Sequence, residues 1–322
     1  MSPSPPVSII IPNFNGALLL EKNLPSVLLA LDAYYGGGRV IVVDDGSVDN
    51  SIGVLSEQFP HVQVIQHPEN LGFAEAIHSG VRAADTQALI FLNSDVQPEP
   101  GFIDPLMQKL CEEGVFSVQS AICEESGSIH PYCLFRFRFR RGSLKRLKTP
   151  NLGTRPWLCL YASGGSMAVD KGKFEELGGF LAVFKPFYWE DFDLGVRAWR
   201  RGWQTWLVPA SEVLHQKHGS IRDNVKRKRV RRALQGNKLV AEWIHFPVKT
   251  LAVWLLPRLV IRTLARTLTG DVGYWQALGD AIRRIPEVLA IRRDIKASAR
   301  QDFLEVLRLI EEENNGHGIE VL

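Results

Sequence analysis

The chain has 322 residues, of which 45% are hydrophobic and 23% are charged. This composition excludes a disordered or fibrous protein, and the length gives room for one large domain or one domain with an appendage. The net charge of +3 hides an asymmetry, since residues 221–322 contain 19 Lys and Arg against 12 Asp and Glu, whereas residues 1–220 contain 19 against 23. Clustered basic charge predicts a polyanionic partner for the C-terminal part, either nucleic acid or an anionic membrane surface.

The four cysteines form no Cys-x-x-Cys pair, and the first residues show no secretory leader pattern. Unpaired spacing of this kind argues against both a zinc site and a disulfide framework. We therefore expect reduced thiols and a cytoplasmic protein.

The first part of the chain alternates short apolar runs with segments of helical periodicity. Strands are predicted at residues 7–11, 39–43, 62–66 and 88–92, and helices at 18–31, 47–59 and 73–84. A helix from residue 101 and a strand at 115–118 continue the alternation. Strands that are apolar on both faces predict a mostly parallel sheet covered by helices on both sides. The expected fold class is therefore α/β, with a Rossmann-like nucleotide-binding half.

Three consecutive strand ends carry polar residues, namely Asn13 with Asn15, Asp44 with Asp45, and Asn93 with Asp95. The carboxyl ends of parallel strands converge on one crevice, where nucleotides bind. An Asp at such an edge can hold a divalent cation that brings a phosphate with it. Taken alone, each of these strand ends is also explained by a plain polar turn. The absence of both Gly-x-Gly-x-x-Gly and Gly-x-x-x-x-Gly-Lys-Ser/Thr argues against a dinucleotide dehydrogenase and a P-loop enzyme.

Phenylalanine and arginine alternate between residues 135 and 141, so that an extended chain would carry arginines on one face and phenylalanines on the other. A solvated edge strand is one interpretation of this pattern. The functional hypothesis is that Arg138 and Arg140 receive an anionic acceptor such as a diphosphate.

Three acids follow an aromatic residue in the segment Trp189-Glu190-Asp191-Phe192-Asp193. They fall in the first turn of a predicted helix, where the helix dipole favours carboxylates, and capping would account for one of them. An aromatic wall for a sugar ring beside a carboxylate base is the functional interpretation. His215 is more often a structural residue in such a position, unless a metal is already indicated.

Taken together, these motifs resemble those of the inverting glycosyltransferases of family 2 over about residues 5–220. The most similar subgroup is the bacterial rhamnosyltransferase-like enzymes that extend lipid-linked or cell-wall glycans. The resemblance implies the glycosyltransferase A fold, a nucleotide-sugar donor and a divalent cation, Mg²⁺ or Mn²⁺. It rests on the segments 7–16, 43–49, 70–73, 93–95, 178–180 and 190–194, together with His215.

The resemblance also implies roles for single residues in donor binding. Asp44 and Asp45 would bind uracil or thymine and ribose, which points to a UDP- or dTDP-sugar. The other expected donor contacts are Pro12, Asn13, Asn15, Asn70, Gly72, Asn93 and Ser94.

For the reaction itself, Asp95 would ligate the metal, with Asn93 in place of the first acid of the family's Asp-x-Asp motif. His215 would be a further metal ligand, with His218 as the alternative. Asp191 would be the general base, and the acceptor would meet Trp189 and Glu190, with Arg138 and Arg140.

The basic tail contains tryptophans and leucines at helical spacing, but its apolar run is broken by Lys249, Arg258 and two prolines. A membrane-spanning helix needs about 20 apolar residues, so we expect no crossing here. An interfacial helix on an anionic membrane fits the pattern. Packing on the catalytic domain or on a partner subunit is an equally open alternative. We also expect one amphipathic helix over residues 282–309 and a frayed end from Glu311.

The predicted organisation is a catalytic domain at residues 1–220 and a basic helical extension at 221–322. The predicted function is transfer of a rhamnose-like sugar or other hexose from a nucleotide-diphosphate donor to a lipid-linked or polysaccharide acceptor, at the inner face of a membrane. A homo-oligomer stays possible, and no nucleic-acid-binding module is present, so nucleic acid is not an expected partner. The alternative is an inactive nucleotide-sugar-binding scaffold of a glycan-assembly complex.

Overall fold

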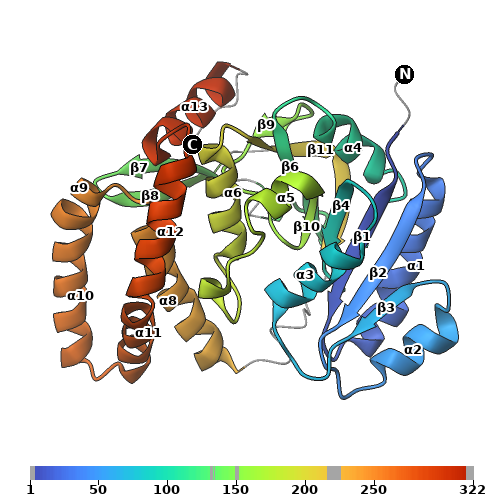
Figure 1. Ribbon diagram of the computed structural model, residues 1–322, viewed down its shortest axis with the longest axis horizontal. Coiled ribbons are helices and arrows are strands. Elements are labelled where there is room, and N and C mark those ends of the chain that lie inside the picture. Colours follow the sequence, from blue (N-terminus) through green and yellow to red (C-terminus); the bar gives the residue numbers. More distant parts are fainter. Residues whose placement is uncertain (1–3, 131–132, 134, 149–151, 216–225, 317–322) are drawn as a thin grey trace.

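The computed structural model describes residues 4–130, 133, 135–148, 152–215 and 226–316. A nine-stranded sheet runs through the first 215 residues in the order β3-β2-β1-β4-β10-β6-β11-β5, with β9 paired to β11 (Figure 1). Its strands are β1 Val7–Asn13, β2 Gly38–Asp44, β3 Gln63–Gln66, β4 Ala88–Leu92, β5 Val96–Pro98, β6 Val115–Glu124, β9 Trp157–Leu158, β10 Ser166–Asp170 and β11 Gln204–His215.

The predicted parallel half of the sheet is confirmed, because β1 pairs in parallel with β2 and β4, and β2 with β3. The strand β10 then runs antiparallel between β4 and β6. The strand β6 is longer than the expected 115–118, since its burial continues through Ile122 and β11 pairs along it to Glu124. The α/β class is confirmed, with an antiparallel insertion that apolar runs alone did not predict.

Alternate residues of each strand point to two helical layers. Ile9 of β1 lies in a cluster with α1 Ala17–Ala33, α2 Ser51–Gln58 and α4 Ile103–Leu110. Its neighbour Ile10 lies in a cluster with the helices of the other face, α3 Phe73–Ala83, α5 Lys171–Glu176 and α6 Glu190–Arg200. Alternation of this kind is what a strand buried on both faces requires.

The helix α2 begins at Ser51, four residues later than predicted. The carboxylate of Asp49 accepts hydrogen bonds from the backbone N–H and the hydroxyl of Ser51, and so holds the preceding turn outside the helix. Because β2 ends at Asp44 and α2 begins only at Ser51, the polar turn 45–50 lies at the edge of the sheet.

The Phe-Arg segment is extended as predicted, but it forms a separate hairpin rather than an edge of the main sheet. The strand β7 Phe135–Arg140 pairs antiparallel with β8 Ser143–Lys148. Phe139 contacts Phe246 and Phe303 edge-on, so the hairpin packs on the C-terminal helices.

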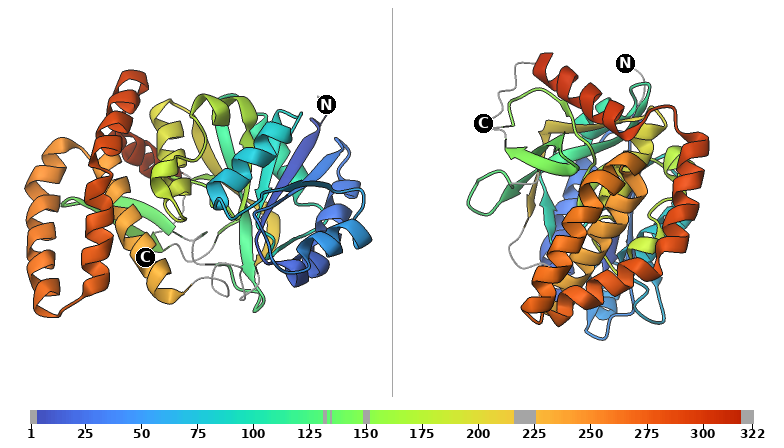
Figure 2. Two further views of the ribbon diagram at one scale, coloured as in Figure 1. Left: turned by 60° about the horizontal axis from the view of Figure 1, so that its bottom comes forward. Right: turned by 90° about the vertical axis from the view of Figure 1, so that its left-hand side faces the viewer.

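The helices of residues 227–316 form a layer beside α6, on the side away from β1–β3 (Figures 1 and 2). They share one apolar cluster with Leu158, Phe184, Phe192 and Trp199. They are α8 Arg227–His245, α9 Val248–Thr250, the π-helical turn η3 Leu251–Leu255, α10 Leu256–Leu268, α11 Val272–Arg283, α12 Ile285–Ser298 and α13 Phe303–Gly316.

Two expectations for the tail were wrong. The segment 282–309 is divided among α11, α12 and α13, because the chain leaves the helix at Arg284 and again after Ser298. Residues 311–316 are helical rather than frayed, since buried Asn314 bonds both backbone groups of Leu158 and Glu311 accepts from Arg138. The rest of the predicted frayed end lies outside the described residues. None of the described helices is long and apolar enough to cross a membrane, as the broken apolar run predicted.

Candidate active site

The turns after β1 and β2 are tied together at the sheet edge. Asp44 is fully buried, and its carboxylate accepts hydrogen bonds from Asn13 Nδ2 at 2.9 Å and from the backbone N–H of Ser47 at 3.0 Å. Asn15, in a left-handed conformation with φ 50°, donates its N–H to Ser47 Oγ and accepts from the N–H of Val48. Asn13 Oδ1 is buried without a hydrogen-bond partner among the described residues, so one amide oxygen of this edge is left for a ligand.

Asp45 organises the loop before α3. Its carboxylate contacts His67 Nδ1 at 2.7 Å and accepts the backbone N–H groups of Leu71 at 2.9 Å and Gly72 at 2.8 Å. His67 reaches Ser79 Oγ with its other ring nitrogen. Gly72 has φ 93°, which favours glycine. The expected donor contacts at Asp44 and Asp45 stay predictions, and in this structure both carboxylates position neighbouring groups.

The triplet after β4 presents one buried carboxylate. Asp95 is 5% exposed, and its Oδ1 has no hydrogen-bond partner among the residues described. Burial raises the pKa of Asp95, and His215 opposes that shift. Ser94 is buried and its carbonyl accepts from Asn23, while Asn93 is half-buried. An unsatisfied buried carboxylate is a feature that a cation would resolve.

His215 lies at the end of β11, opposite Val96 of β5, and its Nε2 is 3.8 Å from Asp95 Oδ2. The ring of His130, which the sequence reasoning overlooked, lies 5.7 Å from that of His215. His218 lies outside the described residues. Within the described chain no group of three His, Cys, Asp or Glu side chains is placed to hold a metal ion. The metal-binding roles expected for Asp95 and His215 stay predictions.

A small-residue turn, Ser163-Gly164-Gly165, links this triplet to α6. The carbonyl of Gly165 accepts the N–H of Asn93 at 3.0 Å, while the N–H of Gly164 bonds the carboxylate of Asp191. The predicted metal ligand and the predicted base therefore lie on either side of one turn.

Among the acids that open α6, Asp191 accepts the backbone N–H of Phe192 at 2.7 Å, whereas the N-cap residue Trp189 makes no side-chain capping bond. Burial raises the pKa of Asp191 to about 6, against the stabilising N–H groups of Phe192 and Gly164. Burial, together with the charge of Asp191, raises the pKa of Glu190 to about 8. Glu190 Oε2 finds no hydrogen-bond partner in the described part of the chain. Two neighbouring buried carboxyls disfavour being ionised together, so they titrate as a pair.

The residues just before these acids are held by the C-terminal helices. Tyr188 and Trp189 have φ of 74° and 78°, a left-handed conformation that is costly for aromatic residues. Asn237 of α8, fully buried, donates to the carbonyls of Phe184, Phe187 and Tyr188. Arg284 in turn donates to Asn237 Oδ1 at 2.6 Å and to the carbonyl of Val183.

Asp193, the third acid, has a structural role. Burial would raise its pKa, but Arg197 at 2.7 Å and His245 at 2.8 Å outweigh this and hold the pKa below its usual value. Arg197 also donates to the carbonyls of Leu177 and Gly179. His245 belongs to α8, so the extension is tied to α6 at a second point.

The remaining residues predicted to contact the acceptor or the donor lie in different places: Trp189 is beside the acids, whereas Arg138 and Arg140 are on the β7–β8 hairpin. Trp189 packs on Phe192, with 5.2 Å between ring centroids, next to the acids. Arg138 is engaged by Glu311 at 2.6 Å, whereas Arg140 is exposed on the hairpin. Pro12 is half-buried, and Asn70 is exposed beside the loop that Asp45 holds.

The sequence reasoning missed His67, Asn237 and His245. The last two interrupt the apolar face of α8, which buries Ala233, Val240 and Ile244. A polar residue on an apolar helix face is a signal that it has a buried partner, although the pattern does not identify that partner.

Comparison with known proteins agrees with this geometry. The family model for glycosyl transferase family 2 matches residues 8–178. An N-acetylglucosaminyl-diphospho-decaprenol L-rhamnosyltransferase of Mycobacterium tuberculosis is 28% identical over 231 residues, covering 63% of this chain and 74% of that protein. A pre-mycofactocin glycosyltransferase of the same species is 25% identical over 308 residues, covering 94% of this chain and 60% of its own length.

Two solved structures share the fold. GalNAc-T7 with UDP, GalNAc and Mn²⁺ superposes with a TM-score of 0.67 at 18% identity, covering 98% of this chain and 58% of that one. The mannosyltransferase PcManGT of Pyrobaculum calidifontis, in complex with GDP-Man and Mn²⁺, gives 0.55 at 16% identity, covering 98% and 81%. The resemblance inferred from the motifs is thus confirmed, and the chain belongs to glycosyl transferase family 2.

Proposed function

We propose that this glycosyltransferase moves a hexose, rhamnose-like or other, from a UDP- or dTDP-sugar to a lipid-linked or glycan acceptor, with inversion at the anomeric carbon. The observation that carries the proposal is the shared turn 163–165, which bonds the Asp95 triplet on one side and Asp191 on the other. The M. tuberculosis relative named above acts, by its name, on an acceptor carried by diphospho-decaprenol.

Asp95 and His215 would hold a divalent cation, with the donor diphosphate completing its ligands. The buried, unpartnered Oδ1 of Asp95 fits this role. Both solved neighbours contain Mn²⁺ with a nucleotide or nucleotide sugar. When bound, the cation neutralises charge that develops on the leaving diphosphate.

Asp191 would accept the proton of the acceptor hydroxyl as its oxygen attacks the sugar from the face opposite the diphosphate. A base works best when its pKa lies near the working pH, and burial raises the pKa of Asp191 to about 6. Trp189 and Glu190 would line the acceptor side, while Asn13, Asn15 and Gly72 would contact the donor.

A thermal-shift screen of UDP-, dTDP- and GDP-sugars with Mn²⁺ tests the donor side. We expect stabilisation by a UDP- or dTDP-sugar that requires the metal and is lost in Asp95→Ala. A protein that binds no nucleotide diphosphate under these conditions would instead be a scaffold without transferase activity.

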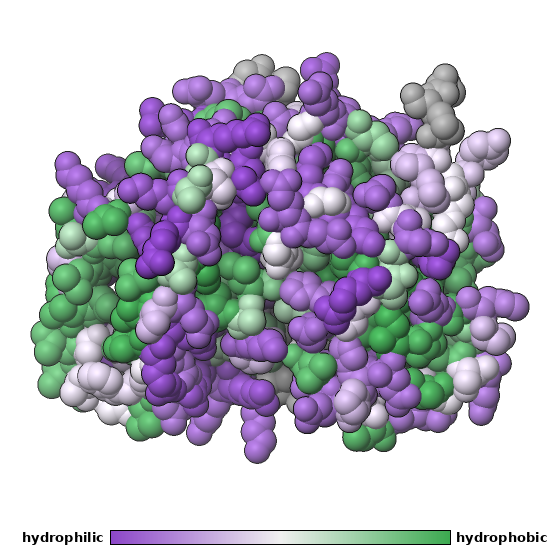
Figure 3. All heavy atoms as spheres, viewed as in Figure 1, coloured by the Kyte–Doolittle hydropathy of each residue, from purple (hydrophilic) through white to green (hydrophobic). Residues whose placement is uncertain are grey.

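We also propose that the extension touches the inner face of an anionic membrane. Exposed large apolar residues cluster on η3, α10, α11 and α12, and the first turns of α8 are exposed and basic. Figure 3 shows the apolar surface at the edge of the molecule formed by α10. Flotation with anionic and neutral vesicles tests this contact, which should be stronger with anionic lipid.

A further inference from the structure

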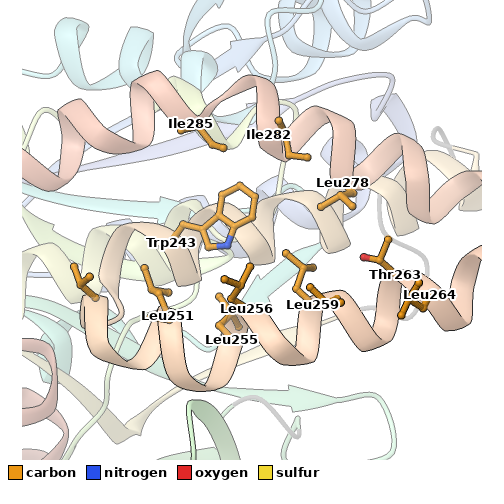
Figure 4. Close-up of a pocket in the computed structure, with 13 residues that line it drawn as sticks. Trp243, Leu251, Leu255, Leu256, Leu259, Thr263, Leu264, Leu278, Ile282 and Ile285 are labelled. Carbon is orange, nitrogen blue, oxygen red and sulfur yellow. The ribbon is translucent and has the colours of Figure 1, made fainter.

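An apolar groove lies between η3–α10 and the helices α11 and α12. Its volume is about 610 Å³, within the usual range for ligand pockets. Figure 4 shows Leu278, Ile282 and Ile285 on one wall, η3 and α10 on the other, and Trp243 of α8 between them. Most of the remaining lining residues belong to η3 and α10, among them Ala252, Thr263 and Leu264.

The groove offers a ligand almost no polar group. The hydroxyl of Thr263 is within 2.7 Å of the hydroxyl of Tyr274, so it is already hydrogen-bonded. The other lining side chains are aliphatic, apart from the indole of Trp243. A ligand that fits must itself be a hydrocarbon over this length.

The three arginines of α10 all contact neighbouring parts of the protein, although Arg258 is itself exposed. Arg258 donates to the carbonyl of Arg141, Arg262 covers the ring of Tyr274, and Arg266 bonds Asp271. Its apolar residues stay exposed, with Leu256 at 58% and Leu264 at 62%, and none of its side chains is fully buried. The helix therefore holds the groove open through polar contacts on its other flank.

The backbone of the groove wall is also unusual. Residues Leu251–Leu255 form a π-helical turn, and three of its side chains line the groove. Such turns are rare and occur frequently at functional sites.

Basic side chains lie beyond one end of the groove, at the end of α10 and in the first turns of α8. Arg231 of α8 and Arg266 of α10 both contact the carboxylate of Asp271, which brings the first turns of α8 to the far end of α10. The side chains that precede Arg231 there, Lys226, Arg227, Lys228 and Arg229, are exposed. A hydrocarbon groove with cations beyond one end is complementary to an amphiphile with a chain and an anionic head.

We propose that the groove holds the isoprenoid chain of a lipid-diphosphate acceptor, and that the cations at the start of α8 face its diphosphate. This inference rests on the proposed lipid-linked acceptor and assigns it a site within the extension. The helices α8 and α11, through Asn237 and Arg284, also fix the loop before Asp191, so the same layer would bind the lipid and position the base.

A binding experiment with farnesyl diphosphate, on the full chain in detergent-free buffer, tests the site without needing the true acceptor or the donor. Ala252 lines the groove and is exposed, so Ala252→Trp fills the groove while keeping its surface apolar. We expect its Kd for farnesyl diphosphate to rise roughly tenfold or more. Ala265→Trp, on an exposed α10 position outside the groove, is the matched control and should bind as the wild type does.

A separate variant tests whether the diphosphate lies at the start of α8. Lys228→Glu should weaken farnesyl diphosphate while leaving farnesol binding unchanged, since only the former carries the anion. Equal weakening of both ligands, or of neither, would contradict a diphosphate at the start of α8.

Other occupants give different results. If farnesyl diphosphate does not bind, yet vesicles of anionic lipid do and Leu264→Asp abolishes that binding, the groove is a bilayer-insertion surface and the proposal is overturned. A dimer in light scattering that Leu264→Asp dissociates would assign the groove to a second copy. Failure of the donor screen would remove the glycosyltransferase proposal while leaving farnesyl diphosphate binding as a separate result.

Discussion

The carboxylates on the two sides of the candidate site differ in their hydrogen bonding and in their pKa values. At the ends of β1 and β2, Asp44 and Asp45 receive hydrogen bonds from side chains and backbone N–H groups and hold two loops in place. At the start of α6, Glu190 lacks a partner for one oxygen in the described chain, and burial raises the pKa values of both Glu190 and Asp191. The first side fixes the geometry of two loops, and the second suits the proton transfer that we propose for Asp191, so substitutions on the two sides should have different effects.

The largest effect is expected from Asp191→Asn, which keeps the shape and removes the base. Transfer should fall by about 10²–10⁴-fold, the usual contribution of general base catalysis. Donor affinity, measured by thermal shift, should not change. In the wild type the rate should fall as pH drops below about 6, because Asp191 is then protonated.

Glu190→Gln is the neighbouring control, since it removes the other ionisable group of the pair and leaves Asp191 in place. It should retain most of the activity at neutral pH. If Asp191→Asn lost donor binding and transfer equally, Asp191 would be structural and the contrast between the two sides would collapse.

Asp45→Ala should act on the other side through loop position. It leaves His67 and the N–H groups of Leu71 and Gly72 without their acceptor. Each orphaned group costs about 1–3 kcal/mol, so urea denaturation should show a clear loss of stability. Donor Kd should rise while the pH profile of transfer keeps its shape. If Asp45→Ala changed the acid side of the pH–rate profile and left donor affinity unchanged, Asp45 would not act through loop position.

Asn237→Ala tests whether the C-terminal layer supports the base. Losing its bonds to three carbonyls should relax the strained backbone at Tyr188 and Trp189, and kcat should fall roughly tenfold with donor affinity preserved. Asn314→Ala is matched, because Asn314 is also buried but bonds the backbone of Leu158 rather than the loop before the acids. If Asn237→Ala and Asn314→Ala lost kcat equally, the effect of Asn237 would be explained by a general loss of stability and not by support of the base.

Much of this site was predictable from the chain because local rules govern it. The strand ends at Asn13, Asp44 and Asn93 follow apolar runs, and parallel topology brings such ends together. The bonds of Asp45 to Leu71 and Gly72 depend on loop geometry that no periodicity encodes. Asn237 and His245 act across about fifty residues of sequence, on the loop before Glu190 and on Asp193, and long-range pairing of this kind is set by tertiary packing. The contacts of the α10 arginines could not be predicted either, since helical spacing gives the face that these residues share but not the groups that they contact.

The last effect is a change in the pH dependence of stability, which bears on folding rather than on transfer. The folded-state pKa of Glu190 is raised to about 8, so its stabilising contribution is complete below the unfolded value near 4.5 and is lost as pH rises through 8. Glu190→Gln removes that loss, so the variant should gain stability relative to the wild type between pH 5 and about 8. Urea titrations at several pH values measure this difference. Asp193, whose pKa is lowered, has the opposite sign and should lose its contribution as pH falls. A wild type whose stability relative to Glu190→Gln does not change with pH would mean that Glu190 ionises freely, and the acids of α6 would then resemble the satisfied carboxylates of the donor side.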